Sequence, residues 1–443
     1  MLVGHGPIDY IVVIFSLFFS ISLLRKKPIE LLLYLPTLLS IDFFIPVASD
    51  LTTGRLLPLF LVVWLVKTGS WKISKFNHWW IESFLITIAV SIIFAIIQDD
   101  AGMRPVIRGL SYLNLVAIFS FVYQIIHKEK GFLHFFKGLA VAGIVHGTYS
   151  IYQVLAHYLG LPYRGIVRSA NVVSSAVLSN GAFRINGLAD EPKRLGLILI
   201  ASAVAILFLS TRQNNNSKKM LATIYAVIVF ILSLLTYSSS YILSLLLWLP
   251  ALLLLSKRSY KYAFGLIIFF LFLSLIIPSS GKFYLKSQFD LLNARQEEIE
   301  SGLDAETVYR QEFYARDFIL KHPEVGFTGV GIGRYNQVFS DEYGGNAGLT
   351  ENGKLAPLNS ELLQVVYDFG VAGIILVYCF TLYIVYKIRK KGEIGFFIAS
   401  ILLYEIIQSL FVQSLPIMFF TAGAGASLLQ QSSHKRFSQL SIK

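Results

Sequence analysis

Residues 194–211 read RLGLILIASAVAILFLST, and a basic loop with Arg212, Lys218 and Lys219 follows them. The run holds no charge after its first residue, and it is long enough to cross a bilayer, whose hydrocarbon core takes roughly 20 helical residues. Twelve similar apolar runs lie elsewhere in the 443 residues, mostly separated by short loops. The sequence therefore predicts an all-α polytopic membrane protein.

The composition favours the same class of protein. Hydrophobic residues make up 55% of the chain and charged residues 14%, and 32 glycines add to the apolar share. A soluble chain has roughly 45–50% apolar residues with glycine included. The net charge of +12 does not indicate nucleic-acid binding, because each Lys and Arg must be judged by its side of the membrane. The single cysteine, Cys379, lies in an apolar run, so no disulfide is predicted in any external loop.

The apolar runs predict about 13 transmembrane helices, or 12–14, because one run is short and two are tightly joined. We interpret the first run as a retained span, since no basic residue precedes it and no small-residue cleavage site follows it. The predicted spans are residues 8–24, 29–48, 56–70, 79–97, 106–126, 136–159, 194–211, 220–238, 239–256, 262–279, 362–386, 394–412 and 416–430. The resulting parts are helices 1–6 (1–159), an external loop (160–193), helices 7–10 (194–280), a large external loop (281–357), helices 11–13 (358–430) and a tail (431–443).

Basic clusters recur on one side when the predicted spans alternate. Seven clusters hold 22 of the 38 Lys and Arg residues. The positive-inside rule makes this side cytoplasmic and places the N-terminus and both long loops outside. The clusters are Arg25 to Lys27; Lys67, Lys72 and Lys75; Lys128, Lys130 and Lys137; Arg212, Lys218 and Lys219; Lys257, Arg258 and Lys261; Lys387 to Lys391; and Lys435, Arg436 and Lys443.

The first external loop combines five basic residues with two acids, against the positive-inside bias. Arginine binds phosphate through two parallel charge-assisted hydrogen bonds, so the loop predicts an anionic ligand near the membrane surface. Binding of lipid head groups, or pairing of the basic residues with the acids, is the alternative. The basic residues are Arg164, Arg168, Arg184, Lys193 and Arg194, and the acids are Asp190 and Glu191.

The second external loop predicts an amphipathic helix over residues 305–321, in which Arg310 shares a face with Tyr314. The alternative interpretation of its charges is a set of i,i+4 ion pairs, worth a few tenths of a kcal/mol each. These pairs are Glu306–Arg310 and Glu312–Arg316. The stretch 326–334, GFTGVGIGR, predicts a turn whose backbone amides could cradle an anion, without the spacing of a nucleotide-binding motif.

A helix is predicted to begin at Pro357 and to continue to the basic cluster at Lys387. Its length of about 45 Å exceeds the bilayer core, so its first turns should project outside beside the two loops. These turns carry Asn359, Ser360 and Glu361. The alternative for Glu361 is an acid that interacts favourably with the helix dipole.

Few ionisable residues fall within the predicted spans, and such residues are functional candidates by default. Glu405, near the middle of its span, is the strongest of them, with packing against an internal polar partner as the alternative. No His/Cys/Asp cluster has metal-ligand spacing, so neither a metal nor a cofactor is predicted. The in-span residues are Asp42, Glu82, His146, His157, Asp368 and Glu405.

Stretches in and beside the two external loops together resemble the bacterial O-antigen polymerases (Wzy-type) and O-antigen ligases. The first is Arg184-Ile-Asn-Gly-Leu-Ala-Asp-Glu-Pro192, directly before a span. The second is Arg310, His322-Pro323, Gly329-Val-Gly331 and Gly333. The third is Asn359-Ser360, Leu363-Gln364, Asp368 and Gly370, where the family often has His-Asn, Leu-Gln, an acid and Gly. Ligases carry a histidine where this chain has Asn359, so the resemblance favours a polymerase.

The resemblance implies a glycosyltransferase at the periplasmic face of the bacterial inner membrane. It would join undecaprenyl-pyrophosphate-linked repeat units, with inversion and without a metal ion. We expect Arg184 and Arg310 to bind the pyrophosphate and Glu361 to act as general base, with Asp190 and Glu191 as rivals. The expected substrate-binding residues are Arg164, Arg168, Arg194, Arg334, Asn359 and Tyr314.

The expected partners are the lipid-linked glycans and membrane lipids, with a chain-length regulator protein as a further candidate and no nucleic acid. An O-antigen ligase that acts on lipid A-core is one alternative function. A lipid-linked glycan transporter or flippase is another, although midplane charges and repeated halves would then be expected. A non-catalytic scaffold would leave the external arginines unexplained.

Overall fold

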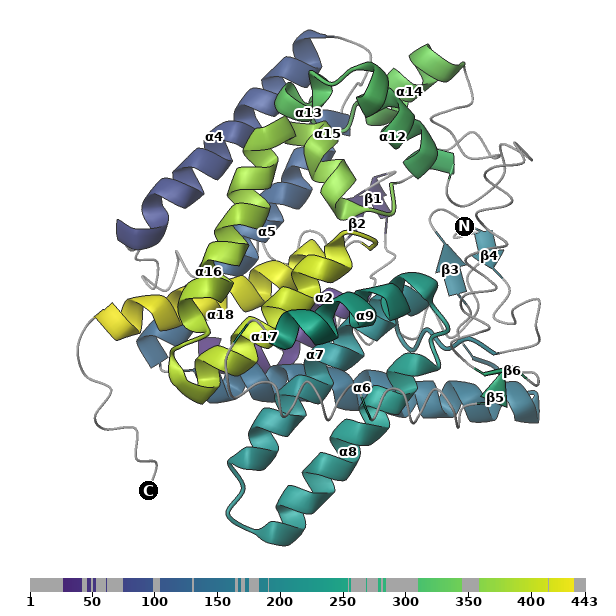
Figure 1. The fold of residues 1–443 in the computed structure, drawn as a ribbon, viewed down its shortest axis with the longest axis vertical. Helices are drawn as coiled ribbons and strands as arrows, with labels where there is room; N and C mark the ends of the chain where they lie inside the picture. Colours follow the sequence, from purple (N-terminus) through teal and green to yellow (C-terminus); the bar gives the residue numbers. More distant parts are fainter. Residues whose placement is uncertain are drawn as a thin grey trace.

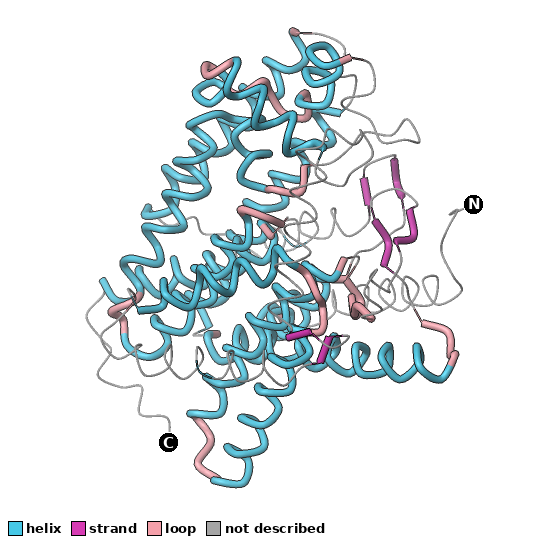
Figure 2. The backbone as a smooth tube through the Cα atoms, turned by 45° about the vertical axis from the view of Figure 1, so that its right-hand side comes forward, coloured by secondary structure: helices cyan, strands magenta, loops and turns pink. Residues whose placement is uncertain are grey.

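The computed structural model describes the backbone of residues 27–41, 46–48, 51–52, 61, 75–98, 104–129, 131–163, 166–168, 172–174, 183–189, 191–253, 255, 268, 278–279, 282–283, 310–344, 358–412 and 414–433. This part of the chain is helical, and Figure 2 shows how little of it the strands occupy. The strands form three antiparallel pairs. The pairs are β1 (Pro46–Ala48) with β2 (Leu51–Thr52), β3 (Ile166–Arg168) with β4 (Val172–Ser174), and β5 (Pro278–Ser279) with β6 (Lys282–Phe283).

The helices follow the apolar runs of the sequence (Figure 1). Those before the second external loop are α2 (Pro28–Ser40), α4 (Lys75–Ile97), α5 (Arg104–Glu129), α6 (Phe132–Leu159), α7 (Pro192–Thr211), α8 (Asn216–Leu234) and α9 (Ser239–Leu253). Three shorter helices of that loop are α12 (Arg310–Lys321), α13 (Val325–Thr328) and α14 (Tyr335–Tyr343). The last are α15 (Glu361–Gly373), the π-helix η1 (Ile374–Cys379), α16 (Phe380–Ile388), α17 (Gly392–Ser409) and α18 (Leu415–Ser433).

Seven stretches of helix in the described part are long and apolar enough to cross a membrane. Helices Pro28–Ser40 and Ser240–Leu253 are apolar but shorter. The fold is thus that of a helical, multi-pass membrane protein. Predicted span 8–24, and most of 56–70 and 262–279, lie outside the described residues, so the total of 13 stays a prediction. The seven are His78–Ile97, Arg104–His127, Phe132–Leu159, Pro192–Thr211, Asn216–Leu234, Glu361–Ile388 and Gly392–Ser409.

Small residues and buried polar side chains join the helices to one another. Gly423 of α18 lies so close to α5 that a Cβ at this position would be 2.7 Å from the carbonyl oxygen of Phe119. Ser202 of α7 donates a hydrogen bond of 2.6 Å to the carbonyl oxygen of Leu139 in α6. Small residues are typical of helix contacts within membranes, because they let two backbones approach closely.

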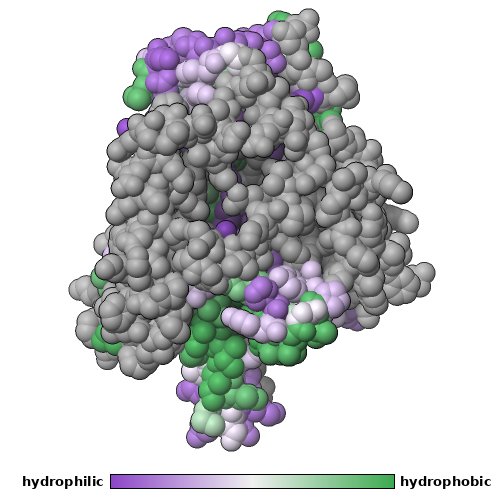
Figure 3. All heavy atoms as spheres, turned by 90° about the vertical axis from the view of Figure 1, so that its right-hand side faces the viewer, coloured by the Kyte–Doolittle hydropathy of each residue, from purple (hydrophilic) through white to green (hydrophobic). Residues whose placement is uncertain are grey.

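The outer surface is apolar along some helices and polar at the ends of the molecule. On α4, the side chains of Ile86, Ile93 and Ile97 are 62%, 57% and 75% exposed. Figure 3 shows hydrophilic residues gathered at the end opposite α8, and hydrophobic residues along the flank of the α8 projection. Apolar side chains exposed in this way suit contact with lipid.

The predicted continuous helix from Pro357 to Lys387 is wrong, because the chain breaks at Gly370. Gly370 has a left-handed φ of 60°, and a Cβ there would be 2.7 Å from the backbone nitrogen of Gly329. Figure 1 shows α15 and α16 as two arms that meet beside α13. Only the arm from Val371 to Ile388 keeps the length of a span, about 27 Å at 1.5 Å per residue. The arm before the break instead positions the candidate site.

Candidate functional site

Three segments that are distant in the sequence meet at the start of α15. Lys193, in the first turn of α7, donates from Nζ to Oδ1 of Asn359 at 2.5 Å and pairs with Glu191 at 2.8 Å. The backbone N–H of Asn359 donates to Oε1 of Glu312 in α12, also at 2.5 Å. The structure thus brings the end of the first external loop, the second external loop and Asn359 together. We call Lys193, Asn359 and Glu312 the loop junction.

The alternative interpretation paired Glu312 with Arg316, and these two described residues form no such ion pair in the structure. Its side chain instead accepts the hydrogen bond from the backbone N–H of Asn359, and Arg316 is exposed. Its second oxygen, Oε2, is buried and has no hydrogen-bond partner among the described residues. Burial raises the pKa of Glu312, while the N–H of Asn359 and the charge of Lys193 act in the opposite direction.

A second polar group surrounds Asp368, whose side chain is fully buried. Tyr112 of α5 donates to Oδ2 at 2.6 Å, and the backbone N–H of Gly333 donates to Oδ1 at 2.9 Å. The guanidinium of Arg108 lies 3.8 Å from Oδ2 through its Nε atom. A buried carboxylate requires such donors and an opposite charge, because its removal from water is otherwise costly. Asp368 therefore fixes α5, the glycine-rich turn and α15 to one another.

The glycine-rich turn does not form the predicted anion cradle, because its amides bind protein acceptors. The N–H of Val330 donates to the carbonyl oxygen of Tyr367 at 2.7 Å, and that of Ile332 donates to Oγ of Ser91 at 3.0 Å. The N–H of Gly333 is bound to Asp368. A turn with its N–H groups used in this way holds helices together and is not arranged to bind phosphate.

Arg104 and Arg334 contact the polar groups around this turn. Arg104 lies over the ring of Tyr335, 5.7 Å from its centroid, and also donates to Oδ1 of Asn336. Arg334 donates to Oε1 of Gln98 at the end of α4. The structure therefore places the predicted substrate-binding residue Arg334 beside α4 and outside the loop junction.

Glu361 lies at the start of α15, but its carboxylate interacts with a different helix. Its Oε2 accepts hydrogen bonds from the backbone N–H groups of Ser414 and Leu415, the latter at 2.8 Å. These groups lie at the N-terminus of α18. An acid there satisfies N–H groups that would otherwise be unbonded, and it interacts favourably with the helix dipole. The positive charges of Arg108 and Arg194 also attract the carboxylate of Glu361. Glu361 is 6% exposed.

Of the two arginines predicted to bind pyrophosphate, only Arg184 has a described side chain, so their shared role stays a prediction. Arg184 donates from Nε to the carbonyl oxygen of Thr236 at 3.4 Å, next to the end of α8. Arg310 is the first residue of α12, and its side chain lies outside the described part, as does that of Arg168. Arg164 and Asp190 lie outside the described residues altogether.

Tyr314 packs between α12 and α14 rather than at the loop junction. Its ring stacks on that of Tyr343, with centroids 4.6 Å apart. The hydroxyl of Tyr343 donates to Oδ2 of Asp317 at 2.8 Å, and Lys321 pairs with the same oxygen at 2.8 Å. The structure therefore shows Tyr314 in a contact between two helices, and its substrate contact stays a prediction.

The in-span ionisable residues mostly have ordinary polar partners. Oε1 of Glu405 accepts a hydrogen bond of 2.9 Å from Thr421, as the packing alternative predicted. Glu82 pairs with His78 at 3.1 Å, and Nε2 of His146 lies 2.7 Å from the hydroxyl of Ser40. Over the described part of the chain, no group of three His, Cys, Asp or Glu residues could hold a metal ion.

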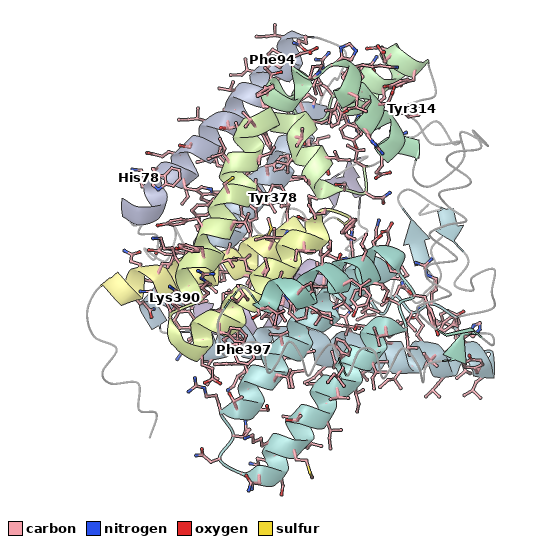
Figure 4. The ribbon with its side chains drawn as sticks, viewed as in Figure 1. His78, Phe94, Tyr314, Tyr378, Lys390 and Phe397 are labelled. Atoms are coloured by element: carbon pink, nitrogen blue, oxygen red, sulfur yellow. The ribbon has the colours of Figure 1, made fainter. Side chains whose placement is uncertain are left out.

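Helix ends that the charge pattern assigns to one side lie near one another. Contacts at the end predicted to be external include Lys193 with Asn359 and Glu361 with Leu415. At the other end, Arg212 pairs with Glu393 at 2.9 Å. Figure 4 labels Phe94 and Tyr314 at the upper end of the molecule and Lys390 much lower. The candidate site therefore lies at one end of an apolar bundle.

No protein-family model and no curated protein sequence matches the chain. The function must therefore be argued from the motifs and from the polar contacts at this end of the bundle.

Proposed function

We propose that this chain is a polysaccharide polymerase that joins undecaprenyl-pyrophosphate-linked repeat units into O-antigen or a related surface polysaccharide. The observation that carries the proposal is the loop junction. It unites Lys193, which directly follows the first motif, with Glu312, beside Arg310 of the second, and Asn359 of the third. Segments that bind a common substrate must lie together, and these three do.

The chemistry of the substrate fits a polar site at the end of an apolar bundle. The polyprenyl chain of a lipid-linked glycan remains in the bilayer, and its pyrophosphate lies at the membrane surface. Cationic groups near that surface would stabilise the negative charge that develops on the leaving pyrophosphate, which lowers the free energy of the transition state. Lys193, Arg108 and Arg194 are the described cations around Glu361 and Asn359, with Arg184 and Arg310 as the proposed pyrophosphate ligands.

The proposed reaction transfers a glycan from one lipid carrier to another. An acceptor hydroxyl attacks the anomeric carbon of the donor with inversion, its proton passes to a carboxylate, and undecaprenyl pyrophosphate leaves with the electrons of the broken C–O bond. No nucleotide is needed, which suits a site on the periplasmic face of the inner membrane. Lipids and a chain-length regulator remain the proposed partners.

The glycan profile of a deletion strain tests this function. A polymerase predicts that lipid A-core carries a single repeat unit when the gene is deleted, and that long chains return when the gene is restored. Complete loss of glycan from lipid A-core would instead indicate the ligase or flippase alternative. An unchanged profile would contradict all three functions.

A further inference from the structure

We infer that Glu312 is the carboxylate that accepts the proton of the acceptor hydroxyl, an inference that rests on the proposed polymerase function. Sequence spacing alone gave this residue an ion pair with Arg316. The structure instead places it at the loop junction with one oxygen bound and the other unbound. A general base needs this combination of fixed orientation and an oxygen that no other donor occupies.

The contacts of Glu312 fix the direction of its unbound oxygen. Oε1 is held at 2.5 Å by the backbone N–H of Asn359, two residues before α15 begins. The side chain of Asn359 is held in turn by Lys193 of α7. Oε2 is buried without a hydrogen-bond partner among the described residues. An acceptor hydroxyl that donates to Oε2 would satisfy this atom.

The other described carboxylates near the site are less suited to the role. Asp368 has hydrogen bonds to both of its oxygens. Glu361 uses one oxygen to bind two N–H groups of α18, and Glu191 is paired with Lys193. Glu405 has an unbound oxygen, but it is fully buried in the middle of α17 and bonds to Thr421. Glu312 lies outside the predicted spans, in the second external loop, and is linked through Asn359 to the end of the first.

The surroundings of Glu312 also set its basicity. Burial raises its pKa, so its ionised form is a stronger proton acceptor than an exposed glutamate. The charged group that acts on it from α7 is Lys193, which pairs with Glu191, while the segment before α15 contributes the neutral Asn359. On α14, Glu342 faces Lys321 instead. Since the base must be ionised, activity should fall as the pH drops through this raised pKa.

The proposed step balances without a further reactant. The hydroxyl O–H bond breaks as its oxygen forms the new bond to the anomeric carbon, and the proton passes to Oε2 of Glu312. The bond from the anomeric carbon to the pyrophosphate oxygen breaks, and undecaprenyl pyrophosphate leaves with that electron pair. Glu312 then releases the proton to water.

The test compares Glu312→Gln with Glu324→Gln in the purified full-length chain, using undecaprenyl-pyrophosphate-linked repeat units. Glutamine keeps an oxygen that can accept from Asn359, so the fold should be retained. Glu312→Gln should lower kcat by about 100- to 10,000-fold with little change in KM, and remove the acidic limb of the pH profile. Glu324→Gln makes the same chemical change at a 66% exposed side chain, and its activity should equal that of the wild type.

Two results would overturn the inference in different ways. Wild-type kcat in Glu312→Gln, or a lowered kcat that keeps the acidic limb, would exclude Glu312 as the base and leave the polymerase function standing. A wild-type protein that binds these lipids but forms no polymer would refute the function and this role with it. A thermal melt of each variant, matched to the wild type, guards against loss of folding.

Discussion

The hydrogen bond from Tyr112 to Asp368 should make a measurable contribution to stability. The change Tyr112→Phe removes only the hydroxyl that donates to Oδ2 at 2.6 Å. The carboxylate then keeps the N–H of Gly333 on its other oxygen, and Arg108 remains 3.8 Å from the oxygen that lost its donor. Because Asp368 is fully buried, water cannot easily replace the lost bond.

A hydrogen bond to a charged group contributes about 1.5–3 kcal/mol. The loss predicts a shift of roughly 10- to 150-fold in the unfolding equilibrium, at 1.4 kcal/mol per factor of ten. The assay is reversible unfolding in mixed detergent micelles, followed by circular dichroism. Tyr404→Phe is the matched control, because Tyr404 is fully buried and its hydroxyl has no hydrogen-bond partner among the described residues. The control should be as stable as the wild type, or more so. Equal stability of the Tyr112→Phe and wild-type proteins would refute the proposed role of the Asp368 group.

The remaining predictions concern the arginines, Glu361 and the topology. Arg184→Lys and Arg310→Lys keep the charge but lose the forked geometry, so polymer should fall by roughly 10- to 150-fold at normal protein levels; undiminished polymer from both would reject pyrophosphate binding. Because Glu361 caps α18, Glu361→Gln should lower the free energy of unfolding by about 0.5–2 kcal/mol and leave the activity per folded molecule unchanged. Abolished activity in a fully stable variant would restore Glu361 as the base. In a cysteine-free background, Leu161→Cys should react with an impermeant external thiol reagent and Lys218→Cys should not, and external labelling at 218 would contradict the predicted topology.

The sequence alone predicts several of the described helices well, because a membrane span requires a long apolar run. The predicted spans 79–97 and 194–211 differ by only a few residues from Lys75–Ile97 and Pro192–Thr211. The predicted span 29–48 is too long, since α2 ends at Ser40 and Pro46–Ala48 forms β1. The break at Gly370 could not be predicted in the same way. A single glycine in an apolar run is compatible with a straight helix, and the break depends on backbone contacts with Phe327 and Gly329, which are distant in the sequence.

The candidate site was predicted only in part. Asn359 and the first external loop were expected to lie together, because they were placed on the same side of the membrane. The bond of Glu312 to Asn359 was missed, since local i,i+4 spacing favoured Arg316 and only the tertiary fold shows the competing donor. Arg104 and Arg108 were missed although a signal existed: two arginines lie at the predicted external end of a span, against the positive-inside rule.

The proposed polymerase activity is tested most directly with the purified full-length chain in proteoliposomes that contain undecaprenyl-pyrophosphate-linked repeat units. The reaction is run with EDTA and analysed by gel electrophoresis of the glycan. We predict a ladder of lipid-linked products that differ by one repeat unit, formed without any nucleotide, and undecaprenyl pyrophosphate released once for each unit joined. Repeat units that remain single, or that are transferred only to added lipid A-core, would contradict the proposed function.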